Sequence, residues 1–275
     1  MGIELNWGAS TDTGLRRRVN EDALIAEFPL FLVADGMGGH EAGELASERA
    51  LAAFRPLVGR PTVSIEDLAG AFGAAVTAVA GIGTQSAAAG TTLTGVAVAE
   101  HAGAGYWLVL NLGDSRTYRM AAGELEQISV DHSAVQELID AGRLAAEDAE
   151  QHPERHVITK AIGAGSRSEP DYWLLPAHAG DRLLVCSDGL SRELDAEQIA
   201  RVLTEEVAPQ AAATRLVHEA LLRGGHDNVT VIVIDAQALP DDDHPTARVG
   251  DPEQDVDEAE TVPRVKLEGA GDGQV

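Results

Sequence analysis

Residues 30–47 of the chain read LFLVADGMGGHEAGELAS. The apolar run 30–34 is short and contains aromatic and β-branched residues, which predicts a buried strand ending in the turn-rich segment DGMGGH. Apolar residues then recur at helical spacing over residues 41–57, and Pro56 closes that pattern. A buried strand, an acidic turn and a helix thus follow one another directly, which places Asp35 at the lip of the predicted core.

Strand patterns and helix patterns continue to follow one another along the rest of the chain. Strands are expected at residues 91–99, 106–111, 116–120, 124–128, 171–175, 182–186 and 229–234, and helices at 67–79, 196–203 and 208–223. Ser64, three residues before Asp67, resembles the start of a capping box. Antiparallel-looking strands interrupted by two blocks of paired helices predict an α+β fold. Residues 131–165 are more polar, and we expect them to form short helical pieces in a small appended subdomain.

The overall charge excludes several classes of partner. The chain has 275 residues with 20 Lys plus Arg against 45 Asp plus Glu, a formal net charge of −25. Such a surface repels phosphate backbones and anionic lipids, so we expect neither nucleic-acid binding nor membrane insertion. No apolar run approaches the roughly 20 residues of a membrane helix. The single cysteine, Cys186, and an N-terminus without a signal-peptide pattern predict a cytoplasmic protein with no intramolecular disulfide.

The composition changes near Pro240. Residues 240–275 contain 11 acidic and three basic side chains and no aromatic residue, which is typical of a disordered acidic tail. We therefore expect one catalytic domain over residues 1–239 and a tail over 240–275. Thr261 follows acidic residues in DEAETVPR; a phosphothreonine there would suit a phosphopeptide-binding domain, whereas the plainer interpretation is a solubilising tail.

Acidic residues recur where strands end or turn. They are the pair Glu21 and Asp22, then Asp35, Asp188 and Asp227. Asp-Gly is a common turn signal, so each such pair has a purely structural interpretation. Unpaired carboxylates at the edge of a core cost several kcal/mol, however, and a group of them requires a cation. Oxygen ligands without His or Cys clusters suit Mg²⁺ or Mn²⁺ better than Zn²⁺.

Three arginines precede the acidic pair. Arg16, Arg17 and Arg18 either form a solvated turn or supply a guanidinium that binds a phosphate in bidentate fashion next to the metals. Spacing by itself leaves both interpretations open.

The chain resembles the bacterial branch of the metal-dependent type-2C (PPM) serine/threonine protein phosphatases. Eight segments carry the resemblance in order: GLRRRVNED (14–22), VADGMGGHEAGELAS (33–47), AGTTLTGVAV (89–98), NLGDSRTYR (111–119), DHSAVQELIDAG (131–142), HVITKAIG (156–163), LLVCSDGL (183–190) and GGHDNVTVIV (224–233). The resemblance implies a four-layer αββα sandwich: two antiparallel sheets flanked by helix pairs, with a small flap insertion at about residues 131–165.

The resemblance also implies roles for individual residues. The implied metal ligands are Asp35 as the bridging carboxylate, the carbonyl of Gly36, the pair Glu21 and Asp22, the carboxylates Asp188 and Asp227, and Asp114 for a third, weaker metal. Arg17 is the implied phosphate-binding arginine, with Arg16 and Arg18 as alternatives. Asn228 is expected to orient Asp227 or a water molecule.

The chemistry implied is attack on phosphorus by a water that two divalent cations, Mn²⁺ or Mg²⁺, activate. This needs no phosphoenzyme, so Cys186 is interpreted as an inert core thiol. His40 either protonates the leaving oxygen or only orders its loop. His132 and Ser133 either contact substrate or cap a helix, and capping is the favoured interpretation.

The function expected from the resemblance is hydrolysis of phosphoserine and phosphothreonine in proteins, opposing bacterial Ser/Thr kinases. The partners would be phosphorylated proteins, either kinases or their substrates. The chain itself is expected to be a monomer. One alternative is a phosphatase dedicated to an anti-sigma-factor antagonist. The other is a pseudo-phosphatase that binds phosphoproteins without turnover, although the sequence retains Asp22, Asp35, Asp188 and Asp227.

Overall fold

The computed structural model describes residues 4–38, 41–82, 89–163 and 169–237. Its strands are β1 (Leu5–Asp12), β2 (Asp22–Glu27), β3 (Leu30–Met37), β4 (Gly90–Thr91), β5 (Leu93–His101), β6 (Ala104–Leu112), β7 (Arg116–Ala121), β8 (Glu124–Gln127), β9 (Ile162–Gly163), β10 (Asp171–Pro176), β11 (Arg182–Cys186) and β12 (Val229–Ala236). Its helices are α1 (Glu41–Ala52), α2 (Ile65–Ala80), α3 (Ala134–Asp140), α4 (Asp188–Ser191), α5 (Ala196–Glu205) and α6 (Pro209–Arg223), with 3₁₀ turns η1 (Arg55–Leu57) and η2 (Ala146–Gln151).

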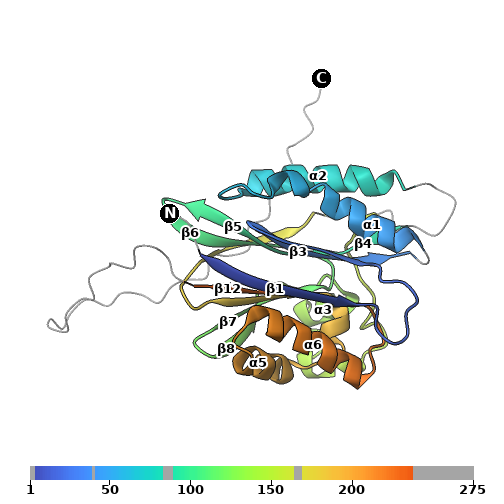
Figure 1. Ribbon diagram of the computed structural model, residues 1–275. Coiled ribbons are helices and arrows are strands. Elements are labelled where there is room, and N and C mark those ends of the chain that lie inside the picture. The colour runs from blue at the N-terminus through green and yellow to red at the C-terminus, as the bar shows by residue number, and fades with distance from the viewer. Residues whose placement is uncertain (1–3, 39–40, 83–88, 164–168, 238–275) are drawn as a thin grey trace.

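The described strands form two antiparallel sheets. One sheet has the order β1-β12-β11-β7-β8; the other has the order β10-β6-β5-β3-β4-β9, with β2 paired to β3. Figure 1 shows the sheets stacked face to face, with α1 and α2 over one outer face and α5 and α6 over the other. The predicted α+β fold, a four-layer αββα sandwich, is therefore confirmed.

Strand β3 explains why the layers stack in this way. Its side chains alternate between two apolar clusters, as the period of two in a strand requires. Leu30 and Leu32 join the cluster beneath α1 and α2, whereas Phe31 and Val33 join the cluster between the sheets. A third cluster lies between the other sheet and the pair α5 and α6. A strand covered on both faces has an unbroken apolar sequence, which is the pattern of residues 30–34.

Local signals in the sequence set several helix ends. At the start of α2, the Ser64 hydroxyl accepts a hydrogen bond from the Asp67 amide, and the Asp67 carboxylate accepts one from the Ser64 amide, so the expected capping box is confirmed. The expected helix over residues 41–57 is shorter than predicted. It ends at Ala52, and η1 follows because Pro56 is compatible only with the first turn of a new helical segment.

Several strand features differ from the sequence expectation, and the short β9, within residues expected to form helical pieces, is one of them. Strand β3 continues through Asp35 and Gly36 to Met37, where a turn was expected, because Gly36 pairs with Thr91. Strands β1 and β2 were not predicted. They carry few fully buried residues, so their apolar period is weak, and pairing with β12 and β3 decides their conformation.

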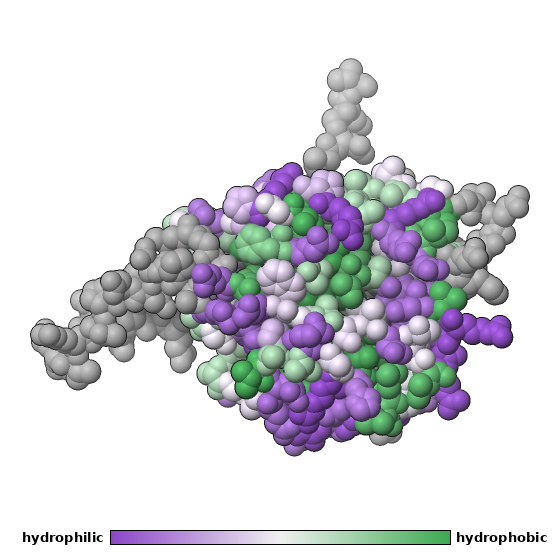
Figure 2. Space-filling view, viewed as in Figure 1, coloured by the Kyte–Doolittle hydropathy of each residue, from purple (hydrophilic) through white to green (hydrophobic). Residues whose placement is uncertain are grey.

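The polar insertion lies between β8 and β10 in the chain. It contains α3 and η2, and a bridge between Ser133 and Ile158 closes its base. Within the part of the chain described, no helix combines the length and the apolar character that crossing a bilayer requires. Figure 2 shows hydrophilic residues gathered at the lower edge of the visible face, in the region where Figure 1 places α5. Arg215 of α6 pairs with Glu205 and Glu206 at the end of α5.

Candidate metal centre

Acidic side chains from five separate segments meet at one edge of the two sheets. Asp22 begins β2 and Asp35 lies near the end of β3, where the two residues face each other across the strand pair. Asp114 lies between β6 and β7, Asp188 follows β11, and Asp227 precedes β12. Each of the other four carboxylates raises the pKa of Asp35 through its charge, which shows that the five groups lie close together.

Hydrogen bonds hold part of this cluster and leave part of it without partners. Asp22 Oδ2 accepts from the Ser187 hydroxyl at 2.8 Å. Within the described residues, four buried carboxylate oxygens of the candidate ligands have no hydrogen-bond partner: Glu21 Oε1, Asp22 Oδ1, Asp114 Oδ1 and Asp188 Oδ1. Burying a carboxylate oxygen without a hydrogen-bond donor costs free energy. Four such oxygens near one another would be stabilised by a cation that binds several oxygen ligands.

The pKa values of the clustered carboxylates also favour a bound cation. Burial, together with the charge of Asp188, raises the pKa of Asp22 to about 7 and that of Asp114 to about 8. The pKa of Asp35 is raised well above its usual value, first by burial and then by repulsion from Asp22. A divalent cation would reverse both causes, because it stabilises the deprotonated carboxylates and screens their repulsion.

The donor set therefore fits divalent metal ions, but the side chains are not arranged around one. Among the described residues, no three acidic, histidine or cysteine side chains are placed so that they could hold a metal ion together. Two guanidinium groups contact the carboxylates instead. Arg17 contacts Asp227 at 2.9 Å, and Arg192 contacts Asp188, Asp114 and Asp227.

The backbone at Gly36 packs too closely for a side chain. Its amide donates to the carbonyl of Glu21 at 3.1 Å, and a Cβ at this position would lie 2.2 Å from the carbonyl oxygen of Gly43. Gly43 is similarly crowded, since its own Cβ would lie 2.4 Å from Glu21 Oε1. Glycine at these positions lets the start of α1 approach Glu21 and the end of β3.

Asn228 contacts both the arginine-rich segment and Asp227. Its side-chain oxygen accepts from the amide of Glu21 at 2.9 Å, and its Nδ2 donates to the carbonyls of Thr13 and Val19. Its backbone amide donates to Asp227 Oδ1 at 2.9 Å. The side chain thus fixes the arginine-rich segment against β12, and the backbone amide holds the Asp227 carboxylate. Of the three arginines in that segment, Arg17 is the one whose guanidinium reaches the acidic cluster, with Glu21 Oε2 a further 3.8 Å contact.

The flap residues His132 and Ser133 divide between two roles. Ser133 caps α3 by accepting a hydrogen bond from the Gln136 amide at 3.2 Å, as expected. His132 is no cap: its Nδ1 accepts from the amide of Gly113 at 3.2 Å, and its Nε2 lies 3.0 Å from Asp171 Oδ2. Because Gly113 directly precedes Asp114, this contact joins the flap base to a candidate ligand. No local sequence signal marks it.

Two further expectations concern single residues. His40 lies outside the described residues. Cys186 is fully buried, and burial raises the pKa of its thiol to about 12. The interpretation of Cys186 as an inert core thiol is confirmed, because a thiol without access or thiolate character is no nucleophile.

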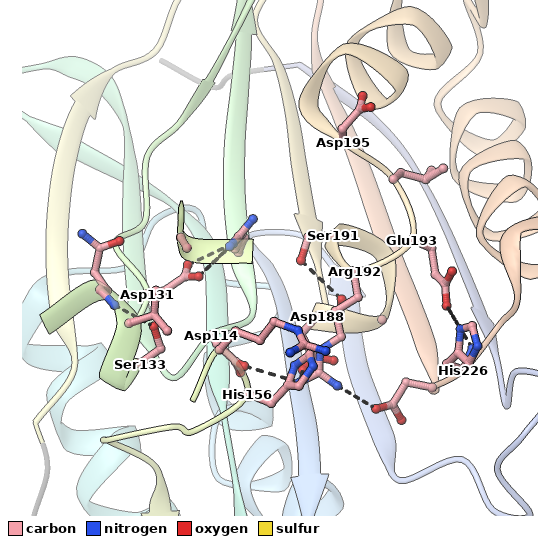
Figure 3. A pocket seen from close by; sticks show the side chains of 18 of the residues that line it. Asp114, Asp131, Ser133, His156, Asp188, Ser191, Arg192, Glu193, Asp195 and His226 are labelled. Atoms are coloured by element: carbon pink, nitrogen blue, oxygen red, sulfur yellow. Dashed lines mark hydrogen bonds and ion pairs between the residues drawn. The ribbon is translucent and has the colours of Figure 1, made fainter. Parts of the chain in front are cut away.

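A cavity of about 890 Å³ opens beside the carboxylates. Its walls come from the flap and from the segment that follows β11, and they include Asp114, His156, Asp188 and Arg192. Figure 3 shows these four side chains crowded together, with Asp195 lying apart from them. A ligand entering this cavity would meet the acidic cluster on one side and the flap on the other.

The raised pKa values predict how the stability of the metal-free chain depends on pH. Between about pH 4 and pH 8, the folded chain holds protons on Asp22 and Asp114 that the unfolded chain, with carboxyl pKa near 3.9, has released. Stability therefore falls as pH rises through this range. We expect the melting temperature of EDTA-treated protein to be about 5 °C lower at about pH 8 than at about pH 5.5, equivalent to roughly 2 kcal/mol.

Differential scanning calorimetry tests this. Saturating Mn²⁺ should raise the melting temperature more at the higher pH, because the ion binds the deprotonated carboxylates. A metal-free melting temperature that increases between the two pH values would contradict the prediction.

Comparisons with known proteins agree with this geometry. The sequence model of the family described as Protein phosphatase 2C matches residues 16–223. The chain is 41% identical over 239 residues to serine/threonine protein phosphatase PstP of Mycobacterium tuberculosis, an alignment that covers 85% of this chain and 45% of that protein. The chain therefore spans about half the length of that relative.

Solved structures are similar over nearly their whole length. The catalytic domain of PstP in complex with two manganese ions is 37% identical, with a TM-score of 0.73 over 85% of this chain and 99% of the other. The PPM Ser-Thr phosphatase MsPP from Mycobacterium smegmatis, in complex with cacodylate, is 38% identical, with a TM-score of 0.77 over 86% and 99%.

Proposed function

The chain belongs to the protein phosphatase 2C family, and from that premise we propose that it hydrolyses phosphoserine and phosphothreonine in proteins. The observation that carries the proposal is the cluster of Asp22, Asp35, Asp114, Asp188 and Asp227, in which Asp22, Asp114 and Asp188 each have a buried carboxylate oxygen without a hydrogen-bond partner. A cluster so strongly negative binds a phosphate monoester only after cations have reversed its local charge.

We propose that the acidic residues near this edge of the sheets would hold divalent cations. We propose Asp35 and the Gly36 carbonyl at the centre, Asp22 and Glu21 on one side, and Asp188 with Asp227 on the other, while Asp114 would serve a third, weaker ion. The related PstP catalytic domain was crystallised with two manganese ions, which supports two Mn²⁺ or Mg²⁺ ions here. When bound, such ions supply a water of lowered pKa and positive charge next to the phosphoryl group.

The remaining groups bind and orient the substrate. Arg17 is only half-buried and contacts Asp227 through one nitrogen, so its guanidinium can turn toward a phosphate without leaving the site. We propose that it binds two phosphoryl oxygens, since its planar fork matches that geometry. His40 is our proposed proton donor to the leaving serine or threonine oxygen. Cys186 takes no part.

Several coarser features remain proposals. We propose a catalytic domain over residues 1–239, with its flap at about 131–165, and an acidic tail over 240–275. The partners required by the activity are phosphorylated proteins, namely Ser/Thr kinases or their substrates. We also propose that the chain acts as a cytoplasmic monomer and that a phosphorylated Thr261 is bound by a phosphopeptide-binding domain.

Phosphate release from peptides tests the proposed function. The purified full chain should release phosphate from phosphothreonine and phosphoserine peptides in the presence of Mn²⁺, and much more slowly from a phosphotyrosine peptide of the same sequence. EDTA should abolish the activity and added Mn²⁺ should restore it. Activity that persists in EDTA, or peptide binding without any turnover, would contradict the proposal; the second result would indicate a pseudo-phosphatase.

A further inference from the structure

We propose that Arg192 is an internal cation that occupies the Asp114 and Asp188 edge of the cluster when no metal is bound, and that a divalent ion must displace it. Arg192 would thereby lower the affinity of this edge for metal. The inference rests on the proposed function, because it assumes that these carboxylates are metal ligands. It concerns a residue that the sequence analysis did not single out.

The contacts of Arg192 join three carboxylates from three segments. Its Nη2 contacts Asp188 Oδ2 and lies 3.8 Å from Asp114 Oδ2, and its Nη1 lies 3.1 Å from Asp227 Oδ2. Arg192 directly follows α4, four residues after Asp188, and its amide donates to the Asp188 carbonyl at 2.9 Å. Helical spacing therefore sets the guanidinium against the Asp188 carboxylate.

The Arg192 guanidinium contacts only some of the carboxylate oxygens of Asp114 and Asp188. Asp114 Oδ1 and Asp188 Oδ1 remain buried without hydrogen-bond partners, in residues that are 7% and 5% exposed. Of the three carboxylates that Arg192 contacts, only Asp227 has a second ion pair, with Arg17, among the described contacts. A divalent cation carries twice the charge of a guanidinium in a much smaller volume and binds oxygens at about 2.0–2.4 Å, so it can use the oxygens that Arg192 leaves unsatisfied. The guanidinium and the ion compete for the same carboxylates.

An open cavity lies beside Arg192, and a displaced side chain could move into it. Its side chain is 31% exposed and lines the cavity of about 890 Å³ between the flap and α4. Figure 3 shows it beside this opening, next to Asp114 and His156. Displacement would move the guanidinium into this cavity and leave it solvated, with no need to bury an unpaired charge. A fully enclosed arginine would have no such alternative.

Arg17 does not play the same part. It shares Asp227 with Arg192, its other ion pair is with Glu21, and it is more exposed than Arg192, at 47%. None of the contacts described for Arg17 involves Asp114 or Asp188 as an ion pair. The displacement we propose therefore concerns Arg192 and the ions that Asp114 and Asp188 would hold.

Calorimetric titration of EDTA-stripped full chain with Mn²⁺ tests this directly. We compare wild type with Arg192→Gln, which removes the charge, and Arg192→Lys, which keeps the charge but loses the planar fork. Arg201→Gln is the matched control, because Arg201 pairs with Glu219 on the surface of α5 and α6. Melting temperatures with and without Mn²⁺ provide a readout that does not depend on activity.

We expect Arg192→Gln to bind its weakest Mn²⁺ ion about tenfold more tightly than wild type and Arg192→Lys to lie between them, with Arg201→Gln unchanged. The metal-free melting temperature should fall in Arg192→Gln, whereas the Mn²⁺-saturated value should change less. Equal Mn²⁺ affinities in wild type and both Arg192 variants, or weaker binding in Arg192→Gln, would overturn this inference alone. No Mn²⁺ binding in any variant would overturn the proposed function, and the Arg192 inference with it.

Discussion

Asp35→Asn is expected to abolish Mn²⁺-dependent phosphate release while making the metal-free chain more stable. The two effects have one cause. Asp35 lies near four other carboxylates, and its charge is both the centre of the proposed metal site and a charge that burial and repulsion disfavour, since both raise its pKa. Asparagine keeps the shape of the side chain and removes the charge.

The expected size follows from the number of interactions lost. Removing the carboxylate proposed at the centre of the metal site should cost about 4 kcal/mol of transition-state stabilisation, which is about a thousandfold in kcat/KM. Near pH 8, the metal-free variant should melt about 3 °C higher than wild type, which corresponds to about 1 kcal/mol. The backbone contacts of Asp35 with Thr91 and Thr92 do not involve the carboxylate, so they remain.

Asp181→Asn is the matched control. Asp181 is also a buried aspartate, but it accepts hydrogen bonds from Trp107 Nε1 and Arg119 rather than facing other carboxylates. Its replacement should therefore destabilise the chain and leave Mn²⁺ binding intact. If Asp35→Asn bound Mn²⁺ and released phosphate as wild type does, the placement of Asp35 at the metal site would be wrong.

Gly36→Ala is expected to be the most destabilising of the small substitutions at the site. The added methyl group would lie 2.2 Å from the carbonyl oxygen of Gly43 and 2.5 Å from that of Glu21, and both are backbone atoms of packed segments. One of these segments must move, so we expect a loss of about 3 kcal/mol and a melting temperature about 9 °C lower.

Gly73→Ala is the contrasting substitution. Gly73 lies within α2, and a Cβ there meets nothing within 4 Å. Alanine should stabilise that helix by about 0.8 kcal/mol, because it has the higher helix propensity. Thermal unfolding followed by circular dichroism measures both variants. A Gly36→Ala chain that is as stable as wild type would show that α1 does not pack against the acidic pair as described.

Much of the fold could be predicted from local sequence. The unbroken apolar run at residues 30–34 identifies a strand covered on both faces, and Ser64 with Asp67 marks the start of α2. These features depend on residues within a few positions of one another, where the period of burial and the geometry of caps act. Where local signals were weak, as in β1 and β2, the sequence missed the element.

The sequence also supplied the acidic residues, and the resemblance supplied their expected roles, but neither placed them. Arg17 contacts Asp227 across 210 positions of the chain, and Ser187 contacts Asp22 across 165. Ser187 follows β11 in one sheet and Asp22 begins β2 in the other, so only the stacking of the two sheets brings them together, and sheet stacking is not encoded in local periodicity. The raised pKa values of the cluster are likewise a property of its burial.

The sequence by itself thus determined the kinds of secondary structure, the excess of acidic groups and the candidate ligands. Only the tertiary structure decided that five carboxylates share one site, that Asn228 fixes the arginine segment, that His132 joins the flap to the loop before Asp114, and that Arg192 lies among the carboxylates. Helix and strand patterns arise from nearest neighbours along the chain. Charge, desolvation and competition for a cation arise from neighbours in space, which folding alone creates.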